Sequence, residues 1–362
     1  MTNHTHSHNI DFKKTFSVTK EEKSQVKISG DIPYEELLNE RPAAIKKLGR
    51  TVKIDGFRTG HIPEAVLVKH IGEMAVLMEM AERAIAHFYP HIIEAHKLDT
   101  IGYPQVEITK IAPGNPLGFT AVVAVIPEVT LPDYQKIAKD INKTQESETI
   151  TDEDVEAKVK DVLRQKAAYE RLQKKANPDE KPIENIDELE IPELTDEVAK
   201  TLGDFENVAD FKTKLREHLE SEKKQEVKTN HRVKLTDAII DATTIDTPQI
   251  LIDSEINQML AQMEEDLKRS NLTMEAYLAH IKKTKEEIIK EWTPGAERRA
   301  KLQLILNKLA QTENIKADEK LVEKQVKEIQ AMYKDAQIDR VYTYVYTLLT
   351  NEAVLVHLEG IK

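Results

Sequence analysis

The first third of the chain alternates between strand-like and helix-like patterns of apolar residues. Residues 12–29 place apolar side chains at alternate positions around a polar turn, which predicts two short strands. Residues 64–97 carry apolar side chains at helical spacing and predict a long helix that is interrupted near Pro90. Residues 104–111 and 118–126 alternate again and predict two more strands. The order strand, strand, helix, strand, strand indicates an α+β domain.

A shorter helical stretch lies between the first pair of strands and the long helix. It begins after Gly30 and Asp31 and contains Pro42, which should break or kink it because proline lacks a backbone N–H. Residues 56–63 follow with the sequence GFRTGHIP, whose two glycines and proline predict an exposed loop. The loop should therefore be held between two helices.

Helical periodicity continues through the rest of the chain. A helix is predicted to begin with Thr151 as its N-cap, and from residue 208 onward almost every segment repeats at helical spacing. Breaks are expected at residues 246–248, 293–295 and 335–337. The apolar stripes are Ile252, Ile256, Met259, Met263 and Leu267; Leu302, Ile305, Leu306 and Leu309; Val322, Val326, Ile329 and Tyr333; and Val341, Val345 and Leu348. We therefore expect a mostly α-helical C-terminal domain.

The composition changes between these two parts. Residues 176–197 hold nine acids, one lysine and three prolines, which predicts an extended, solvated linker. We predict a disordered tail over residues 1–10 and an α+β domain over 11–132. A linker helix and the acidic linker should occupy 133–197, and a helical domain 198–362. The chain is therefore expected to be multi-domain.

Composition excludes several function classes. The 362 residues are 32% charged and 40% hydrophobic with no cysteine, which indicates a water-soluble protein without disulfides, thiolate metal sites or thiol nucleophiles. No segment approaches the ~18 apolar residues of a transmembrane helix. The N-terminus lacks a basic region followed by an apolar stretch, so we expect a cytoplasmic protein. We find no nucleotide loop, serine elbow or paired catalytic carboxylates, and we expect no catalytic residue and no cofactor.

One basic segment stands out in this acidic chain. The net charge is −12, yet residues 41–70 hold seven lysines and arginines against two acids, a net charge of +5. The seven cations are Arg41, Lys46, Lys47, Arg50, Lys53, Arg58 and Lys69. This distribution predicts one localised anionic partner and argues against general nucleic-acid binding.

The loop at residues 56–63 carries residue types that dominate binding hot spots. Phe57 offers apolar area and Arg58 a planar fork of hydrogen-bond donors, on a segment hinged by Gly56 and Gly60. Such a tip can insert between a protein surface and phosphate groups, and nearby cations would make salt-sensitive phosphate contacts. The alternative interpretation is an ordinary helix–helix turn with one buried phenylalanine.

Four blocks of sequence, in the same order, resemble the bacterial trigger factor family. GFRTGHIP at residues 56–63 is similar to the GFRxGxxP ribosome-docking signature of that family. Residues 102–129, with GYPQVEI, GFT and IPEV, resemble the rest of the same ribosome-binding domain. IPELTDE at 191–197 resembles the entry to the helical chaperone domain of the family, and IDTPQILIDSEI at 245–256 resembles a later helix start in that domain. The blocks span most of the chain.

The resemblance implies an ATP-independent chaperone that docks beside the ribosomal exit tunnel, through a ribosomal protein and adjacent rRNA, and shields nascent polypeptides. It also implies an elongated molecule whose helical domain has arm-like extensions, and a homodimer off the ribosome. The implied ribosome-binding residues are Gly56, Phe57, Arg58, Thr59, Gly60 and Pro63, with Lys46, Lys47, Arg50 and Lys53 in support. The family commonly has basic residues where this chain has Thr59 and His61, so we expect weaker ribosome affinity.

Most members of the family carry an FKBP-like prolyl isomerase domain between these two parts. Here the predicted helix ends near Lys175 and leads into the acidic linker and then IPELTDE. The intervening segment has about 20 residues, and chains below about 40 residues rarely fold without disulfides, bound metals or oligomerisation. We therefore expect neither an isomerase domain nor enzymatic activity.

Other signals leave alternatives open. Alternate histidines in residues 4–8, and His87 with His91, have spacings seen in metal sites, but a disordered tail and a structural helix face are preferred, with no metal site. Met259 and Met263 are candidate client-binding residues because methionine adapts to irregular partners, although core packing is the commoner role. The alternative functions are a prolyl isomerase of another design, a SurA-like periplasmic holdase and an acidic scaffold without clients.

Overall fold

The computed structural model describes residues 10–58, 60–144, 147–173 and 192–362. Three of the sequence-based expectations therefore fall wholly or largely on residues outside this description. They concern the tail over residues 1–10, Thr59 in the loop, and the acidic linker over 176–197.

The chain divides into two compact units, and each unit is made of two separate stretches of sequence. The first unit contains residues 1–130 and 243–308, and the second contains residues 131–242 and 309–362. The chain therefore crosses from one unit to the other three times.

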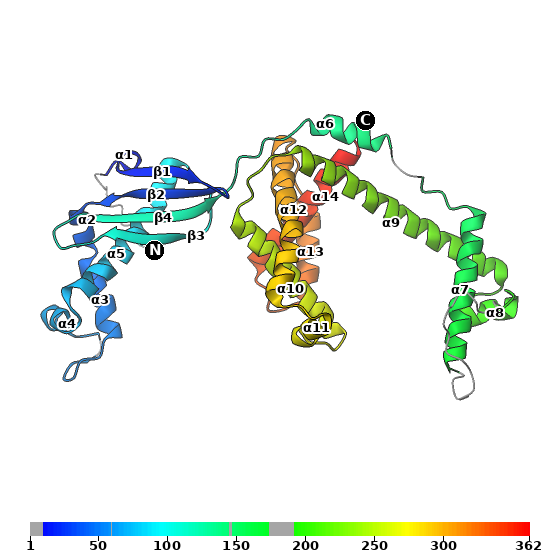
Figure 1. The fold of residues 1–362 in the computed structure, drawn as a ribbon, viewed down its shortest axis with the longest axis horizontal. Coiled ribbons are helices and arrows are strands. Elements are labelled where there is room, and N and C mark those ends of the chain that lie inside the picture. Colours follow the sequence, from blue (N-terminus) through cyan, green and yellow to red (C-terminus); the bar gives the residue numbers. More distant parts are fainter. Residues whose placement is uncertain (1–9, 59, 145–146, 174–191) are drawn as a thin grey trace. The chain divides into compact units, whose positions relative to one another are not determined.

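A four-stranded antiparallel sheet forms the centre of the N-terminal stretch, with the strand order β1-β2-β4-β3 (Figure 1). Its strands are β1 (Phe16–Glu21), β2 (Gln25–Ile32), β3 (Thr100–Lys110) and β4 (Leu117–Val125). β2 and β4 pair in an unbroken register, with Ile28 opposite Ala121. The four predicted strands are thus present. The first prediction is wrong at its start, because residues Phe12–Thr15 form the short helix α1, capped by the Asp11 side chain.

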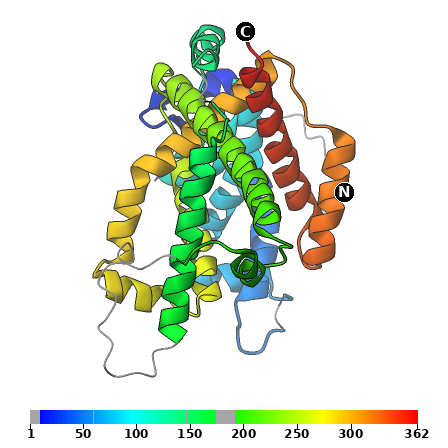
Figure 2. The ribbon, with the colours of Figure 1, turned by 90° about the vertical axis from the view of Figure 1, so that its right-hand side faces the viewer.

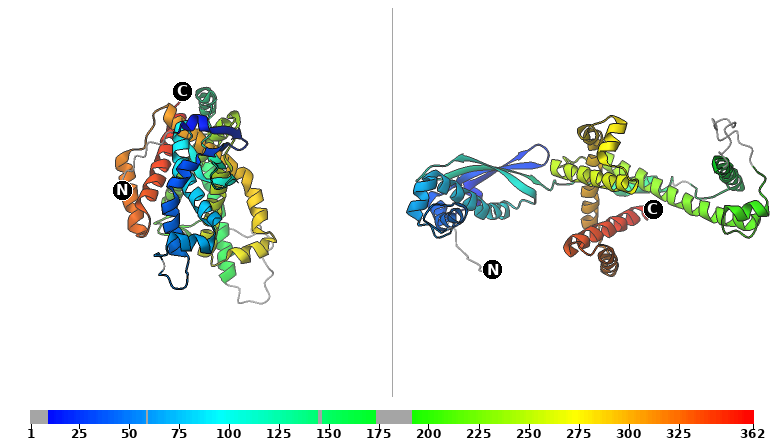
Figure 3. Two further views of the ribbon diagram at one scale, coloured as in Figure 1. Left: turned by 90° about the vertical axis from the view of Figure 1, so that its left-hand side faces the viewer. Right: turned by 90° about the horizontal axis from the view of Figure 1, so that it is seen from below.

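Helices α2 (Tyr34–Asn39), α3 (Arg41–Thr51), α4 (Glu64–Ile71) and α5 (Glu73–His96) follow the first two strands. α5 contributes its apolar side chains to the core beneath one face of the sheet, and α2, α3 and α4 pack against α5 (Figure 3). Pro42 lies in the first turn of α3, where its missing N–H has no helical partner to lose. The predicted break at this proline is confirmed.

The prediction that the long helix is interrupted near Pro90 is wrong. The interruption lies at Gly72, whose φ of +85° separates α4 from α5, a conformation that glycine adopts without strain. Pro90 lies inside α5 and is exposed, as is Ala86 one turn earlier. Water can therefore satisfy the carbonyl that Pro90 leaves without a donor, and packing of the opposite face holds the helix together.

The core of this part is built from the inward face of the sheet and the apolar stripe of α5. Phe16 and Phe119 place their ring centroids 5.8 Å apart, and both side chains are buried. Phe88 of α5 is also buried and extends the aromatic cluster through Phe12, at a centroid distance of 6.0 Å. This packing fixes α5, against which α3 and α4 are placed.

The second stretch of the first unit contains α10 (Gln249–Arg269), α11 (Met274–Ile281) and most of α12 (Lys285–Thr312). The break predicted at 293–295 is wrong, because Pro294 lies inside α12. Pro294 and Gly295 are exposed, whereas the adjacent Ala296 is buried against α10. Packing of α12 against α10 therefore keeps the helix continuous in spite of the proline and the glycine. The predicted break at 246–248 is confirmed by the segment between α9 and α10.

The second unit is entirely helical in its described residues. Its helices are α6 (Tyr134–Asn142), α7 (Asp152–Gln173), α8 (Asp196–Leu202), α9 (Val208–Ala242), α13 (Glu319–Met332) and α14 (Ile338–Glu359). The hydroxyl of Thr151 accepts a hydrogen bond from the Asp154 backbone N–H at 3.2 Å, so the predicted N-cap is confirmed. Figure 2 shows α7 beside the N-terminal half of α9, and the buried side chains of both helices pack with those of α8.

Polar contacts join α6 and α9 to the C-terminal end of α14. The Asn142 side-chain amide donates to the carbonyls of Leu358, Glu359 and Ile361 at 2.8–3.2 Å. These carbonyls belong to the end of a helix, where no backbone donor follows. Arg232 of α9 bonds Glu352 at 2.7 Å and Glu359 at 2.6 Å. Its hydrogen bonds lower the pKa of the Glu352 carboxyl below the usual range.

Within the described residues, we find no helix whose length and hydropathy would let it cross a bilayer.

Candidate functional site

The segment between α3 and α4 is an exposed loop with its own hydrogen bonds. The Phe57 N–H donates to the Ile54 carbonyl at 3.1 Å, and the His61 N–H donates to the Arg58 carbonyl at 2.9 Å. The Gly60 N–H reaches back to the carbonyl of Gly49 in α3 at 2.8 Å. The loop is therefore tied to the preceding helix and is not an open chain.

Two glycines give the loop its shape. Gly56 and Gly60 have φ angles of +83° and +84°, a region that side chains with a Cβ rarely adopt. A Cβ built on Gly56 would meet nothing within 4 Å, so backbone conformation alone explains the residue there. Both glycines of the motif thus adopt a conformation that favours glycine.

Phe57 and Arg58 project into solvent between these two glycines. Phe57 is 41% exposed, and Arg58 is exposed. The residue that the loop buries is Ile62, and Pro63 forms the N-terminal boundary of α4. The alternative expectation of a buried phenylalanine in this helix–helix turn is therefore wrong. An aromatic ring left in water, beside a guanidinium group, is an arrangement suited to contact with a partner.

A basic hollow of ≈540 Å³ lies next to this loop in sequence and structure, on α3 and α5. Its lining residues are Ala43, Lys46, Lys47, Arg50, Thr51 and Arg83. We call this surface the basic hollow. Four of its six residues are cations, which makes it suited to an anionic group such as a phosphate.

The cations of the basic hollow differ in their partners. Lys47 Nζ lies 2.8 Å from Oε1 of Glu79, a carboxylate only 8% exposed. Arg83 Nε donates to Glu40 at 3.0 Å. Within the described part of the chain, Lys46 and Arg50 have no ion-pair partner. The positive charge available to an external anion therefore comes mainly from these two residues.

Arg41 holds the helices on either side of the loop. Its side chain bonds Glu64 at the start of α4 at 2.8 Å and bonds Glu73 at the start of α5 through both terminal nitrogens. The hydrogen bond from Arg41 lowers the pKa of the Glu73 carboxyl below the usual range. Arg41 is therefore a structural residue, although the charge count grouped it with the free cations.

The remaining predicted residues lie partly in the loop and partly on other helices. Lys53 is exposed in the first part of the loop, and Thr59 lies outside the described residues. Met259 and Met263 are half-buried on α10 and line a separate hollow. His87 is exposed on α5, and its Nδ1 lies 3.2 Å from Oε1 of Glu40, just before α3.

Sequence reasoning missed the partners that position the basic hollow. Glu40, Glu73 and Glu79 lie one helix or more away from the cations that they contact, so no local spacing reveals them. A usable signal was the presence of Glu79 at an otherwise apolar position of α5, because a buried carboxylate requires a cation nearby.

Comparison with known proteins matches both parts of the chain. The family model described as bacterial trigger factor protein matches residues 14–162, and the model described as the trigger factor C-terminus matches residues 207–354. Trigger factor from Moorella thermoacetica is 24% identical over 88% of this chain and 87% of its own length. Trigger factor from Salinispora arenicola is 26% identical over 82% of this chain and 80% of its own length.

One solved structure shares the fold. It is described as "Promiscuous Substrate Recognition in Folding and Assembly Activities of the Trigger Factor Chaperone" and matches with a TM-score of 0.52 at 17% identity. The match covers 96% of this chain and all of the other. The family models together cover most of the chain, in the order that the sequence blocks predicted. The chain therefore belongs to the bacterial trigger factor family.

Proposed function

We propose that this member of the family docks on the ribosome through Phe57 and Arg58 and shields nascent polypeptides without ATP. The protein is a ribosome-associated chaperone, as its family indicates. The observation that carries the docking proposal is the exposure of Phe57 and Arg58 on a loop shaped by two glycines with positive φ. The ring supplies apolar contact area to a ribosomal protein, and the guanidinium group supplies several donors.

The basic hollow supplies the second half of the proposed docking surface. Lys46 and Arg50 offer charge that internal carboxylates do not neutralise, so they are suited to phosphates of rRNA. Phosphate contacts weaken with salt, whereas the apolar contact of Phe57 is much less sensitive to salt. Docking raises the local concentration of emerging chain, so individually weak client contacts suffice for shielding.

We propose the same division of labour along the chain as the sequence predicted. Residues 11–132 bind the ribosome, residues 198–362 contact clients, and residues 133–197 connect them. In the free state the protein forms a homodimer, and it acts in the cytoplasm. Family membership supports the division of the chain and the homodimer, and the absence of cysteine fits a reducing cytoplasm.

We propose that the protein does not catalyse prolyl isomerisation. The family models match residues 14–162 and 207–354. α7 ends at Gln173 and α8 begins at Asp196, and the buried side chains of α7, α8 and α9 form one cluster. The intervening segment is shorter than the roughly 40 residues that an unaided domain needs. A protease-free assay on a proline peptide should give the background rate, and acceleration would contradict the proposal.

Ribosome co-sedimentation of the wild type and of Phe57→Ala/Arg58→Ala, at two salt concentrations, tests the docking proposal. The wild type should pellet with ribosomes at low salt, and the double variant should stay in the supernatant. Arg340→Ala/Tyr344→Ala is a matched control, because both residues are exposed on α14. If the double variant pellets like this control, the loop is not the docking element.

A further inference from the structure

Two histidines lie one helical turn apart on α5. His87 is exposed and His91 is half-buried, and the centroids of their rings are 6.0 Å apart. Two imidazoles on one tetrahedral zinc ion have ring centroids roughly 5 Å apart, because each Zn–N bond is about 2.1 Å long. A small rotation of the two side chains would therefore bring both rings onto a single ion.

The carboxylate of Glu40 orients the first of these rings. Its Oε1 lies 3.2 Å from Nδ1 of His87, and its Oε2 accepts a hydrogen bond from Nε of Arg83 at 3.0 Å. A carboxylate accepts, so Nδ1 of the neutral ring carries the proton and the lone pair lies on Nε2. Histidines that bind a metal through one nitrogen are commonly held by a carboxylate at the other. Glu40 is thus a positioning residue for His87.

Two imidazoles are too few for a stable zinc site. Structural zinc sites have four ligands, and catalytic ones have three together with water. In the described part of the chain, no three histidine, aspartate or glutamate side chains are grouped so that they could hold a metal. One or two further ligands must therefore come from residues outside this part.

The described chain begins beside these two histidines. The rings of Phe12 and His91 have centroids 5.6 Å apart, and the Phe12 carbonyl lies 3.4 Å from Nε2 of His96. Ile10 packs against the core, and α1 packs against α5. The N-terminal segment therefore joins the fold next to His91.

Three more histidines precede this junction. They are His4, His6 and His8, which alternate with Thr5 and Ser7. We call residues 4–8 the histidine segment. Its last residue is four positions before Phe12, which places it within ~14 Å of Phe12 along the chain, and its first residue lies within ~29 Å. All three imidazoles can therefore reach the pair on α5.

We propose that His87 and His91 bind a zinc ion together with imidazoles of the histidine segment. The helix supplies two fixed ligands, whereas the segment supplies three whose ordering costs conformational entropy, so neither group forms a tight site alone. Together they offer five imidazoles, of which zinc needs three or four. An all-nitrogen site suits zinc and does not suit magnesium or calcium, which prefer oxygen ligands. The ion fastens the histidine segment to α5.

Sequence spacing alone favoured a disordered tail and a structural helix face. The contact of Phe12 with His91 is the observation that joins the two groups of histidines, because it places the root of the histidine segment at the pair on α5.

Zinc titration of the full chain, purified without an affinity tag, tests the proposal by two readouts. Competition with a chromophoric chelator gives the zinc affinity, and the thermal midpoint reports whether the ion stabilises the folded chain. The wild type should bind one zinc ion per chain with a rise of the midpoint, whereas magnesium should leave the midpoint unchanged. X-ray absorption should show three or four nitrogen ligands at about 2.0 Å.

Variants of each half distinguish a joint site from a chelating tail. His87→Gln/His91→Gln should weaken zinc binding more than about a hundredfold, because the loss of a partner behind a ligand already costs 10–100-fold. His4→Ser/His6→Ser/His8→Ser should weaken it as strongly. Both sets should lose the zinc-dependent rise of the thermal midpoint.

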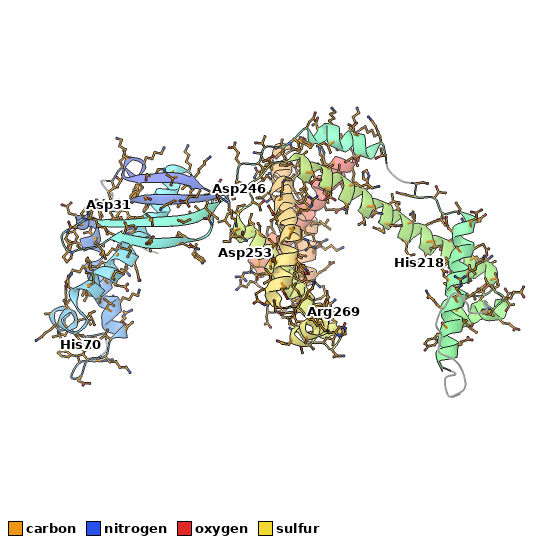
Figure 4. All side chains as sticks on the ribbon, viewed as in Figure 1. Asp31, His70, His218, Asp246, Asp253 and Arg269 are labelled. Carbon is orange, nitrogen blue, oxygen red and sulfur yellow. The ribbon has the colours of Figure 1, made fainter. Side chains whose placement is uncertain are left out.

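Two further variants test positioning and specificity. Glu40→Gln keeps a hydrogen-bond acceptor but removes its charge, and it should weaken zinc binding about tenfold. His70→Gln/His218→Gln is the matched control, because Figure 4 shows these histidines on α4 and α9 and both are exposed. His218 has Glu222 four positions further along its helix, with 3.6 Å between Nε2 and Oε1. The control should bind zinc like the wild type.

Each contrary outcome overturns the proposal. Failure of the wild type to bind zinc would do so, as would wild-type affinity in either half-site variant. Retention of affinity by His87→Gln/His91→Gln would assign the ion to the histidine segment alone. Equal weakening in the control would indicate scattered surface binding. Circular dichroism without zinc checks that each variant is folded.

Discussion

At the scale of single residues, neighbouring lysines of the basic hollow have different roles. Lys47 compensates a carboxylate that is only 8% exposed, whereas Lys46 faces solvent without an ion-pair partner in the described chain. Removal of the cation beside a buried carboxylate leaves that charge uncompensated, which is costly. Removal of a free surface cation costs little stability but removes one contact to an anion.

Lys46→Ala and Lys47→Ala should therefore separate binding from stability. Lys46→Ala should weaken ribosome binding and reduce the slope of log K against log salt by about 1, with unchanged stability. Lys47→Ala should lower the free energy of unfolding by about 1–3 kcal/mol, because Glu79 loses its partner. Urea unfolding and ribosome co-sedimentation over a salt series measure the two effects. Equal losses of stability in both variants would contradict this division.

At the scale of elements, one arginine contacts three helices around the loop at residues 52–63, the proposed docking loop. Arg41 begins α3 and contacts the first residues of both α4 and α5. The end of the loop at Glu64 is thus held by an ion pair, while its tip remains exposed. The helices beside the loop are therefore held together, while Phe57 and Arg58 stay accessible to a partner.

The ion pairs of Arg41 with Glu64 and Glu73 should make the stability of the first unit depend on pH. Arg41 favours the ionised form of Glu73, so the pKa of this carboxyl is lower in the folded than in the unfolded chain. Its contribution is therefore present above the usual glutamate pKa and is lost as pH falls through the folded value. Arg41→Gln should cost about 1 kcal/mol at pH 7 and less at pH 3, measured by urea unfolding. A cost that is the same at both pH values would contradict the assignment.

Sequence patterns predicted most helices and strands, but they did not show where tertiary packing or exposure to water outweighs a local helix-breaking residue. The four strands and the helical C-terminal part follow from periodicity, because burial of one face imposes a repeat. Pro90 and Pro294 were misjudged because exposure and packing, which the sequence does not display, decide whether proline ends a helix. The loop was predicted by its motif, whereas its anchoring by Arg41 depends on carboxylates 23 and 32 positions away.

At the scale of the whole molecule, the segment between α7 and α8 is a natural place for gain or loss of a domain. The two helices belong to one hydrophobic cluster with α9, so packing holds both in place independently of what connects them. Lengthening a connection between fixed ends costs little, with each doubling adding about 0.6 kcal/mol. A domain inserted there would therefore leave the packing of α7, α8 and α9 in place.

Insertion of a small folded domain between Pro182 and Ile183 tests this interpretation. The free energy of unfolding of the remaining chain should change by less than about 1 kcal/mol, and ribosome co-sedimentation should persist. The same insertion between Asn230 and His231, inside α9, should prevent folding because it interrupts a buried helix face. Calorimetry and circular dichroism would show the difference. Unfolding of the rest of the chain by the first insertion would contradict the interpretation.

The threefold crossing between the two units has a consequence for how each copy is made. Residues 10–130, including the docking loop, are translated before either unit is complete, because the first unit needs residues up to 308 and the second needs residues up to 362. A half-made copy therefore emerges with apolar helix faces whose partners have not yet been synthesised. While it is being synthesised, the chaperone is therefore itself a nascent chain with exposed apolar surface. Finished copies of the same protein can shield it.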